Sequence, residues 1–308
     1  MNVAQRIALV TGARGFLGRH VARALEASGF QVHGLGHGEW SQLEARQWGV
    51  AGWVSADVEP GSLQALAIRP NVIIHCAGGG SVGGADQRPF EDFDRGMRSA
   101  AAILDFQRAC APDARLVIPS SAAVYGRAGQ LPIDETAALK PISVYGLHKQ
   151  LVEQLAEYYA ANFHLRISIV RLFSLYGVEL RKQLFWDACR KLAVGDFRFP
   201  GAGDEIRDWL HIDDAVELLR LATEHADRAC PVVNGGAGRG RSVASVLALV
   251  AARFGCEGGI VFTGEQRPSD PSRYEANITR ALEWGWRPRQ DMDAALNAYV
   301  DWFKATIA

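Results

Sequence analysis

The chain has 308 residues, 48% of them hydrophobic, and a formal net charge of −1 at pH 7. This length and apolar content suffice for one large core, or for a large domain with a smaller one attached. The near-zero charge leaves no electrostatic footprint for nucleic acid or an anionic membrane, and no apolar run reaches the ~20 residues that span a bilayer, so we expect neither partner.

The start of the sequence leads straight into an apolar run and carries no signal-peptide pattern. The five cysteines are scattered, without a C-x-x-C pair, and no cluster of cysteines and histidines has the spacing of metal ligands. We therefore expect a protein of the reducing cytoplasm that binds no metal.

The first predicted elements are a strand at 6–10 and a helix at 16–28, joined by a turn that contains Gly12, Gly15 and Gly18. A residue without Cβ allows a tight turn, and the N–H groups at a helix start favour an anion, so this turn is typical of a pyrophosphate site. Its G-x-x-G-x-x-G spacing is one residue longer than the G-x-G-x-x-G dinucleotide fingerprint. The expected cofactor contacts of the turn are Gly12, Arg14, Gly15, Phe16, Leu17 and Gly18.

Apolar runs and helical stretches alternate over the first part of the chain, which predicts an α/β fold with a doubly wound parallel sheet. Beyond residue 176 the regularity fails, and helical patterns are separated by Gly/Pro-bearing loops, which predicts a smaller lobe over 177–308 after a dinucleotide-binding domain over 1–176. Further strands are expected at 31–35, 52–54, 71–76, 115–120 and 166–172, and helices at 91–110, 144–162, 181–194, 213–225, 242–254 and 293–305.

Tyr145 and Lys149 lie one turn apart on the same face of the helix expected at 144–162. An unperturbed phenol has a pKa of about 10, and a neighbouring ammonium group lowers it toward the range of an acid/base catalyst. Ser121 follows the strand at 115–120 and is placed to hydrogen-bond a reacting oxygen.

These motifs and their order resemble the extended short-chain dehydrogenase/reductase family, which contains nucleotide-sugar epimerases, dehydratases and ketoreductases. The resemblance covers nearly the whole chain. Its landmarks, in chain order, are the glycine turn, Asp57, His75-Cys76-Ala77-Gly78, Ser121, Tyr145 with Lys149, the run from Arg171 to Gly177, the run from Arg207 to Asp214, and Arg267-Pro268-Ser269-Asp270.

The resemblance implies a Rossmann-type sheet with a substrate lobe whose segments interleave with the last strands. It also implies a homodimer formed by the helices at 91–110 and 144–162, and a nucleoside-diphosphate sugar as substrate. The implied catalytic residues are Ser121, Tyr145 and Lys149; the cofactor contacts include Asp57, Val58, Ala77, Gly78, Tyr145 and Lys149; the substrate contacts are Ser121, Tyr145, Ser174, Arg207 and Arg267.

The cofactor preference depends on the end of the second strand, where an NAD-selective site has a carboxylate that would repel a 2′-phosphate. Here Gly36 and His37 occupy that end, and Arg14 lies in the glycine turn. We therefore favour NADP(H), with NAD(H) as the alternative if Arg14 only stacks on adenine.

Dehydration is not expected, because Ala122 and Ala123 stand at the positions where the family's dehydratases have an Asp-Glu pair. Hydride transfer at C4 of the sugar remains. The NADP preference favours an NADPH-dependent 4-keto-6-deoxyhexose reductase; the alternatives are a sugar 4-epimerase with tightly bound NAD and a non-catalytic, dinucleotide-sensing regulator. Ser174 and Gly96 stand where relatives commonly have asparagine, which leaves the sugar contacts open.

Overall fold

The computed structural model describes residues 5–256, 259–265 and 271–307. The chain divides into two compact units, and each is built from separate stretches of sequence. The first contains the chain up to Gly126 together with Leu139–Arg171 and Val216–Val233. The second contains Arg127–Ala138, Leu172–Ala215 and the chain from Asn234 onward.

A seven-stranded sheet of order β10-β6-β5-β4-β1-β2-β3 forms the centre of the first unit. The strand β1 pairs in parallel with β2 and β4, and β2 with β3 and β4 with β5 are parallel pairs as well. The strand order reverses between β1 and β4, and such a switch point opens a crevice at the carboxyl ends of the strands. The predicted doubly wound fold is confirmed. The strands are β1 (Arg6–Thr11), β2 (Phe30–Gly36), β3 (Val50–Ser55), β4 (Val72–His75), β5 (Arg115–Ser121), β6 (Arg166–Leu172) and β10 (Val232–Gly235).

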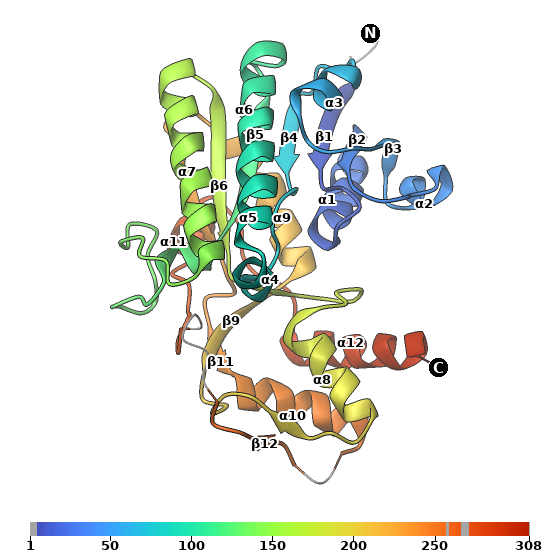
Figure 1. Cartoon of the computed structure of the whole chain (residues 1–308), viewed down its shortest axis with the longest axis vertical. Coiled ribbons are helices and arrows are strands. Elements are labelled where there is room, and N and C mark those ends of the chain that lie inside the picture. The colour runs from blue at the N-terminus through green and yellow to red at the C-terminus, as the bar shows by residue number, and fades with distance from the viewer. Residues whose placement is uncertain (1–4, 257–258, 266–270, 308) are drawn as a thin grey trace. The chain divides into compact units, whose positions relative to one another are not determined.

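One face of this sheet carries a continuous apolar core. Alternate residues of a strand point to the same face, and Leu9, Leu35 and Ile73 are fully buried there with Ile103 and Val152 from helices. Figure 1 shows α6 and α7 in front of the strands and α9 behind them. The helical elements are α1 (Phe16–Ala27), α2 (Gln42–Gln47), α3 (Pro60–Ala65), α4 (Val82–Gln87), α5 (Pro89–Phe93), the π-turn η1 (Asp94–Arg98), α6 (Ser99–Cys110), the 3-10 turn η2 (Ala122–Tyr125), α7 (Val144–Phe163) and α9 (Ile212–His225).

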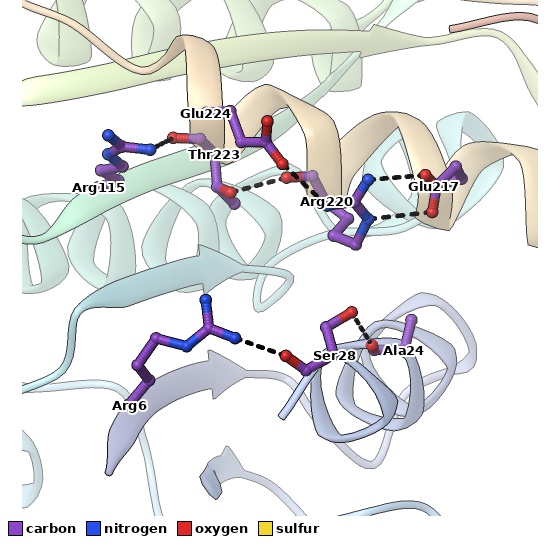
Figure 2. Close-up of polar contacts among 8 residues, drawn as sticks. All are labelled: Arg6, Ala24, Ser28, Arg115, Glu217, Arg220, Thr223 and Glu224. Atoms are coloured by element: carbon purple, nitrogen blue, oxygen red, sulfur yellow. Dashed lines mark hydrogen bonds and ion pairs between the residues drawn. The ribbon is translucent and has the colours of Figure 1, made fainter. Parts of the chain in front are cut away.

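Arginines at the amino ends of two strands bind carbonyl groups near helix ends (Figure 2). Arg6 of β1 donates to the Ser28 carbonyl after α1 over 2.6 Å, and Arg115 of β5 donates to the Thr223 carbonyl in the last turn of α9 over 3.4 Å. A cation near a helix C-terminus also complements the helix dipole. These contacts stabilise the side of the sheet formed by the amino ends of its strands, opposite to the carboxyl ends.

The second unit combines two small sheets with a helical layer. Its three-stranded sheet has the order β11-β9-β7, and β8 pairs with β12. The helix α10 packs against both α8 and α12. The elements are β7 (Ser174–Tyr176), α8 (Gln183–Ala193), β8 (Arg198–Phe199), β9 (Ile206–His211), β11 (Gly240–Ser242), α10 (Val243–Phe254), β12 (Val261–Phe262), α11 (Thr279–Glu283) and α12 (Met292–Ile307).

The helix predicted over 91–110 contains a feature that the apolar pattern did not indicate. The helical run starts at Pro89, and a π-turn over Asp94–Arg98 interrupts it before α6 begins. The Ser99 hydroxyl donates to the Arg95 carbonyl over 2.5 Å and lies 3.2 Å from that of Gly96. In a π-turn some carbonyl groups do not accept the regular i to i−4 helical hydrogen bond, and here the Ser99 hydroxyl donates to them instead.

Candidate functional site

The glycine turn between β1 and α1 fits the phosphate site that the sequence predicts. Gly12 has φ +66°, and a Cβ there would lie 2.8 Å from the backbone of Cys76 and Ala77. A Cβ on Gly18 would lie 2.2 Å from the Gly12 carbonyl oxygen. Gly15 precedes α1 and provides no side-chain cap, so the first N–H groups of the helix are left for another acceptor. The turn therefore requires glycine and leads into an uncapped helix start, which is the geometry of a pyrophosphate site.

A cleft of about 370 Å³ opens at this turn, within the first unit. It is bounded by the ends of β1 to β4 and by the π-turn. Phe16, Leu17 and Gly18 form the first turn of α1 and are not in its lining. The predicted cofactor residues that line it are Gly12, Arg14, Gly15, Gly36, His37, Asp57, Val58, Ala77 and Gly78; Glu59, Cys76, Asp94, Arg95, Arg98 and Ser99 also line it and were missed.

The ends of β2 and β3 meet in this cleft. His37 Nε2 lies 2.8 Å from Asp57 Oδ1, and both side chains are exposed. A Cβ on Gly38 would lie 2.6 Å from Arg14 Nη1, so the guanidinium lies against the loop that follows β2. Arg14 is therefore at the strand end where the sequence predicts discrimination between NAD and NADP.

The three candidate catalytic residues come from β5 and α7. Ser121 ends β5, and its hydroxyl accepts from Ala123 N over 3.2 Å. Tyr145 is half-buried in the first turn of α7, and Lys149 Nζ lies 5.8 Å from the centre of its ring. Lys149 Nζ also donates to the Pro119 carbonyl over 3.1 Å. The ammonium group is thus held between β5 and the phenol.

The start of α7 is capped and lies close against the turn that follows Ser121. The Ser143 hydroxyl caps α7 by accepting from Gly146 N over 3.1 Å. A Cβ on Gly146 would lie 2.4 Å from the Ala123 carbonyl oxygen, so only glycine allows this approach. The elements that carry Ser121 and Tyr145 are therefore in direct contact.

A buried ion pair between β6 and α7 stabilises the same part of the first unit. Arg171 of β6 makes a forked contact with Glu153 of α7, with N–O distances of 2.8 to 3.2 Å, and donates to Tyr125 Oη over 3.0 Å. Ser120 also donates to Glu153. Burial works to lower the pKa of Arg171, but the hydrogen bonds and charge of Glu153 raise it above its ordinary value. The pair connects β5, β6 and α7.

His75 lies beneath the glycine turn and is 4% exposed. Its Nδ1 lies 2.7 Å from the Thr11 hydroxyl, and its Nε2 lies 3.4 Å from that of Ser99. Burial lowers the pKa of His75 to about 3, and the charge of Lys149 adds to the shift. The imidazole is therefore neutral and structural at physiological pH.

The predicted substrate residues Ser174 and Arg207 lie in the three-stranded sheet of the second unit, on the neighbouring strands β7 and β9. Arg207 is 9% exposed and donates to the Ile206 carbonyl over 2.9 Å. In the antiparallel pairing of β9 with β11, the backbone of Arg207 lies opposite that of Arg241. Arg267, the other predicted contact, lies outside the described residues.

The same unit has a cleft of about 310 Å³ that the sequence did not lead us to expect. Trp209 lines it and is 9% exposed, yet its indole N–H has no acceptor among the residues that the structure describes. Arg239, Arg241 and Arg289 line the same cleft, together with Asp214 and Asp291. A buried unpaired donor beside arginines favours a ligand with anionic acceptor atoms. The Arg-Gly-Arg run at 239–241 was the sequence signal.

Membrane-spanning and metal-binding features were both absent from the described part of the chain. Over 5–256, 259–265 and 271–307, no helix is long and apolar enough to cross a membrane. Within the same ranges, no group of three or more His, Cys, Asp or Glu side chains could hold a metal ion.

Comparisons with known proteins point to one family. A family model described as "NAD dependent epimerase/dehydratase family" matches residues 8–235. The chain is similar to the UDP-glucose 4-epimerase of Azospirillum brasilense, with 28% identity over 96% of this chain and 91% of the relative. The UDP-glucose 4-epimerase structure with UDP-glucose from Thermotoga maritima has a TM-score of 0.89 at 23% identity, covering 98% of this chain and 100% of that one. MoeE5 in complex with UDP-glucuronic acid and NAD has a TM-score of 0.83 at 25% identity, covering 97% and 99%.

Proposed function

The chain belongs to the NAD dependent epimerase/dehydratase family, and from this premise we propose that it is a UDP-sugar 4-epimerase that works with NAD. Relatives named as 4-epimerases support the reaction, and the NAD in the MoeE5 complex supports the cofactor. This proposal reverses the order that the sequence favoured, in which an NADPH-dependent reductase came first and the epimerase second.

The observation that carries the cofactor part is the glycine turn. A side chain on Gly12 or Gly18 would clash with backbone, and Gly15 leaves the start of α1 uncapped, so the residues present fit a pyrophosphate. Asp57, Val58, Ala77 and Gly78 would line the adenosine part of the site. When bound, NAD accepts a hydride from a carbon that bears a hydroxyl and returns it to the resulting ketone.

The chain's own residues would handle the proton and the oxygen. Tyr145 would take the proton of the sugar C4 hydroxyl and later return it to the same oxygen, while Ser121 donates a hydrogen bond to that oxygen. Lys149 would place a positive charge beside the phenol, since its Nζ lies 5.8 Å from the centre of the Tyr145 ring. Because the proton returns to the oxygen from which it came, the residues end each cycle as they began, as an epimerase requires.

Dehydration is not part of the proposal. Ala122 and Ala123 follow Ser121, and neither carries a carboxyl group that could act as acid or base. Ala122 is 3% exposed, and the carbonyl of Ala123 is the group against which Gly146 packs. The positions serve the contact between η2 and α7.

The cleft of the second unit is proposed to take the nucleoside diphosphate part of the substrate. Its arginines and the Trp209 N–H, which has no acceptor within the described part of the chain, suit phosphate or carbonyl oxygens. Arg239→Ala is expected to weaken UDP binding roughly 10-fold or more, the loss of one charge-assisted contact, without changing the affinity for ADP-ribose. Equal UDP affinity in parent and variant would remove this cleft from the proposal.

A reductase that uses NADPH remains the second candidate, because Arg14 lies at the end of β2, where a 2′-phosphate would be read. Arg14→Ala is expected to weaken NADPH about 10- to 150-fold, with a much smaller loss for NADH, if the guanidinium neutralises that phosphate. Equal losses for both cofactors would mean that Arg14 only stacks on adenine.

The deciding experiment starts from the protein as purified. We expect mass spectrometry of the released nucleotide to find NAD, and we expect UDP-glucose or UDP-glucuronic acid to convert to the 4-epimer without added cofactor. Protein that carries no dinucleotide and consumes NADPH with a 4-keto sugar nucleotide would replace the epimerase by the reductase.

A further inference from the structure

The π-turn that interrupts the helical run Pro89–Cys110 forms part of the wall of the dinucleotide cleft. We infer that Arg95 and Arg98 of this turn bind the adenosine diphosphate half of the cofactor. The inference rests on the proposed use of a dinucleotide, but not on the choice of sugar or of reaction.

The backbone geometry brings the turn close to the strand ends. A Cβ on Gly78, after β4, would lie 3.7 Å from the Gly96 Cα in the turn. Arg95 and Arg98 lie on either side of Gly96 and both line the cleft, together with Ser99. The Ser99 hydroxyl hydrogen-bonds the carbonyl groups of Arg95 and Gly96, and this stabilises the wider π-turn at the wall of the cleft. Such π-turns occur frequently at functional sites.

Among the residues that the structure describes, the ion-pair partners of the two guanidinium groups are distant carboxylates. Arg95 Nη2 lies 3.8 Å from Glu91 Oε2, and Arg98 Nη1 lies 3.4 Å from Asp94 Oδ1. Both arginine side chains are about two-thirds exposed, at 65% and 70%. Exposed ion pairs contribute little to stability, so either guanidinium can exchange its carboxylate for a phosphate at low cost. The planar fork of arginine suits phosphate oxygens.

The lining of the cleft indicates which half of the dinucleotide these arginines meet. The cleft includes the glycine turn and the ends of β2 and β3, but neither Ser121, Tyr145 nor Lys149 lines it. The reacting end of the cofactor must reach those three residues. The cleft with the two arginines therefore receives the half that does not react, and that half contains a diphosphate.

The test compares Arg95→Ala, Arg98→Ala and the double variant with Arg88→Ala. Arg88 is a matched control, because it is an exposed arginine directly before the same helical run that also pairs with Glu91, at 3.4 Å, and it does not line the cleft. Two measurements are made on protein as purified: the rate at which its bound dinucleotide exchanges with labelled NAD, and the concentration of free ADP that displaces it.

We expect exchange to be at least about 10-fold faster in the double variant, ADP to lose at least as much potency, and Arg88→Ala to match the parent. Competition by nicotinamide mononucleotide should not change. A double lysine variant keeps the positive charges but lacks the planar guanidinium groups, so its exchange rate and ADP potency should lie between those of the parent and of the double alanine variant. It replaces the alanine variant in the test if that variant does not fold.

An exchange rate and an ADP potency equal to those of the parent in the double variants would overturn the inference. The inference would also be overturned if Arg88→Ala changed the exchange rate and the ADP potency equally, because the effect would then come from general surface charge. A parent protein that binds no dinucleotide would instead defeat the proposed function. A parent that binds NAD but epimerises no UDP-sugar would defeat the reaction alone.

Discussion

Tyr145 is the residue on which the proposed chemistry depends most directly. It is half-buried, one turn before Lys149, and its helix packs on the turn after Ser121. The phenol does not line the cleft proposed for the adenosine half of the cofactor. Loss of the hydroxyl should therefore separate catalysis from cofactor binding.

Tyr145→Phe is expected to reduce turnover by about 100-fold or more, because the reacting oxygen loses its acid and base. Dinucleotide affinity should stay nearly unchanged. Steady-state kinetics and the amount of nucleotide that co-purifies with the variant measure the two effects. Activity above a tenth of the parent's would remove Tyr145 from the catalytic role.

His75 makes a second prediction at this scale, and it concerns stability. Its pKa is lowered to about 3 in the folded protein, first by burial and then by the charge of Lys149. The ordinary value is about 6.5, so between these pH values the unfolded chain binds the proton more readily. The contribution of His75 to stability is therefore present above pH ~6.5 and is lost progressively as the pH falls below that value.

His75→Asn keeps a group that can hydrogen-bond Thr11 but does not titrate in this range. Urea unfolding of parent and variant at pH 7.5 and pH 5.5 should show that the parent loses more stability on acidification, by up to about 1.4 kcal/mol per pH unit from this group. Parallel losses in both proteins would show that other groups cause the acid sensitivity.

Among the elements, α7 has the most constrained position. Its start is capped by Ser143, its third residue packs on the Ala123 carbonyl, and its middle holds the Glu153–Arg171 pair. Both charges of the pair are buried, so removal of one partner would leave the other uncompensated. The helix that carries the catalytic candidates is thereby attached at both its start and its middle.

Gly146→Ala should displace the start of α7, because the new Cβ would lie 2.4 Å from the Ala123 carbonyl oxygen. We expect a fall of about 100-fold or more in kcat, the order that a small misplacement of catalytic groups costs. Gly61→Ala is the matched control, since Gly61 also lies in the first turn of a helix but a Cβ there would have no atom within 4 Å. Unchanged kcat in Gly146→Ala would mean that the contact does not position Tyr145.

The whole molecule is predicted to be a homodimer, an expectation that the resemblance implies and that is still to be tested. The helices α5 and α7 carry exposed apolar side chains, among them Phe90 at 79% and Tyr158 at 59%. Such side chains are typical of a surface that is covered in the assembled protein when they form a contiguous patch.

Analytical ultracentrifugation should find a dimer at micromolar concentration, and Tyr158→Glu should shift it toward monomer, because a charge in an apolar interface is costly. Leu282→Glu is the control, since Leu282 is similarly exposed, at 47%, but lies on α11 of the second unit. A parent that sediments as a monomer, or equal dissociation in both variants, would contradict this interface.

The sequence by itself determined the features that depend on near neighbours along the chain. The alternation of apolar runs and helical patterns predicts the strands from β1 to β6, and the spacing of Gly12, Gly15 and Gly18 predicts the turn after β1. The spacing of Tyr145 and Lys149 likewise predicts that they share a helix face. Periodicity and glycine chemistry act over a few residues, so these signals can be read without the fold.

The tertiary structure alone decided which distant residues meet. It added β10 to the main sheet, paired Glu153 with Arg171, and brought Arg95 and Arg98 to the cleft at the glycine turn. It also brought Arg239, Arg289 and Trp209 to the lining of one cleft. A charged residue on a helix or loop has the same local pattern whether it faces water or a ligand, and only the packing of the elements distinguishes the two.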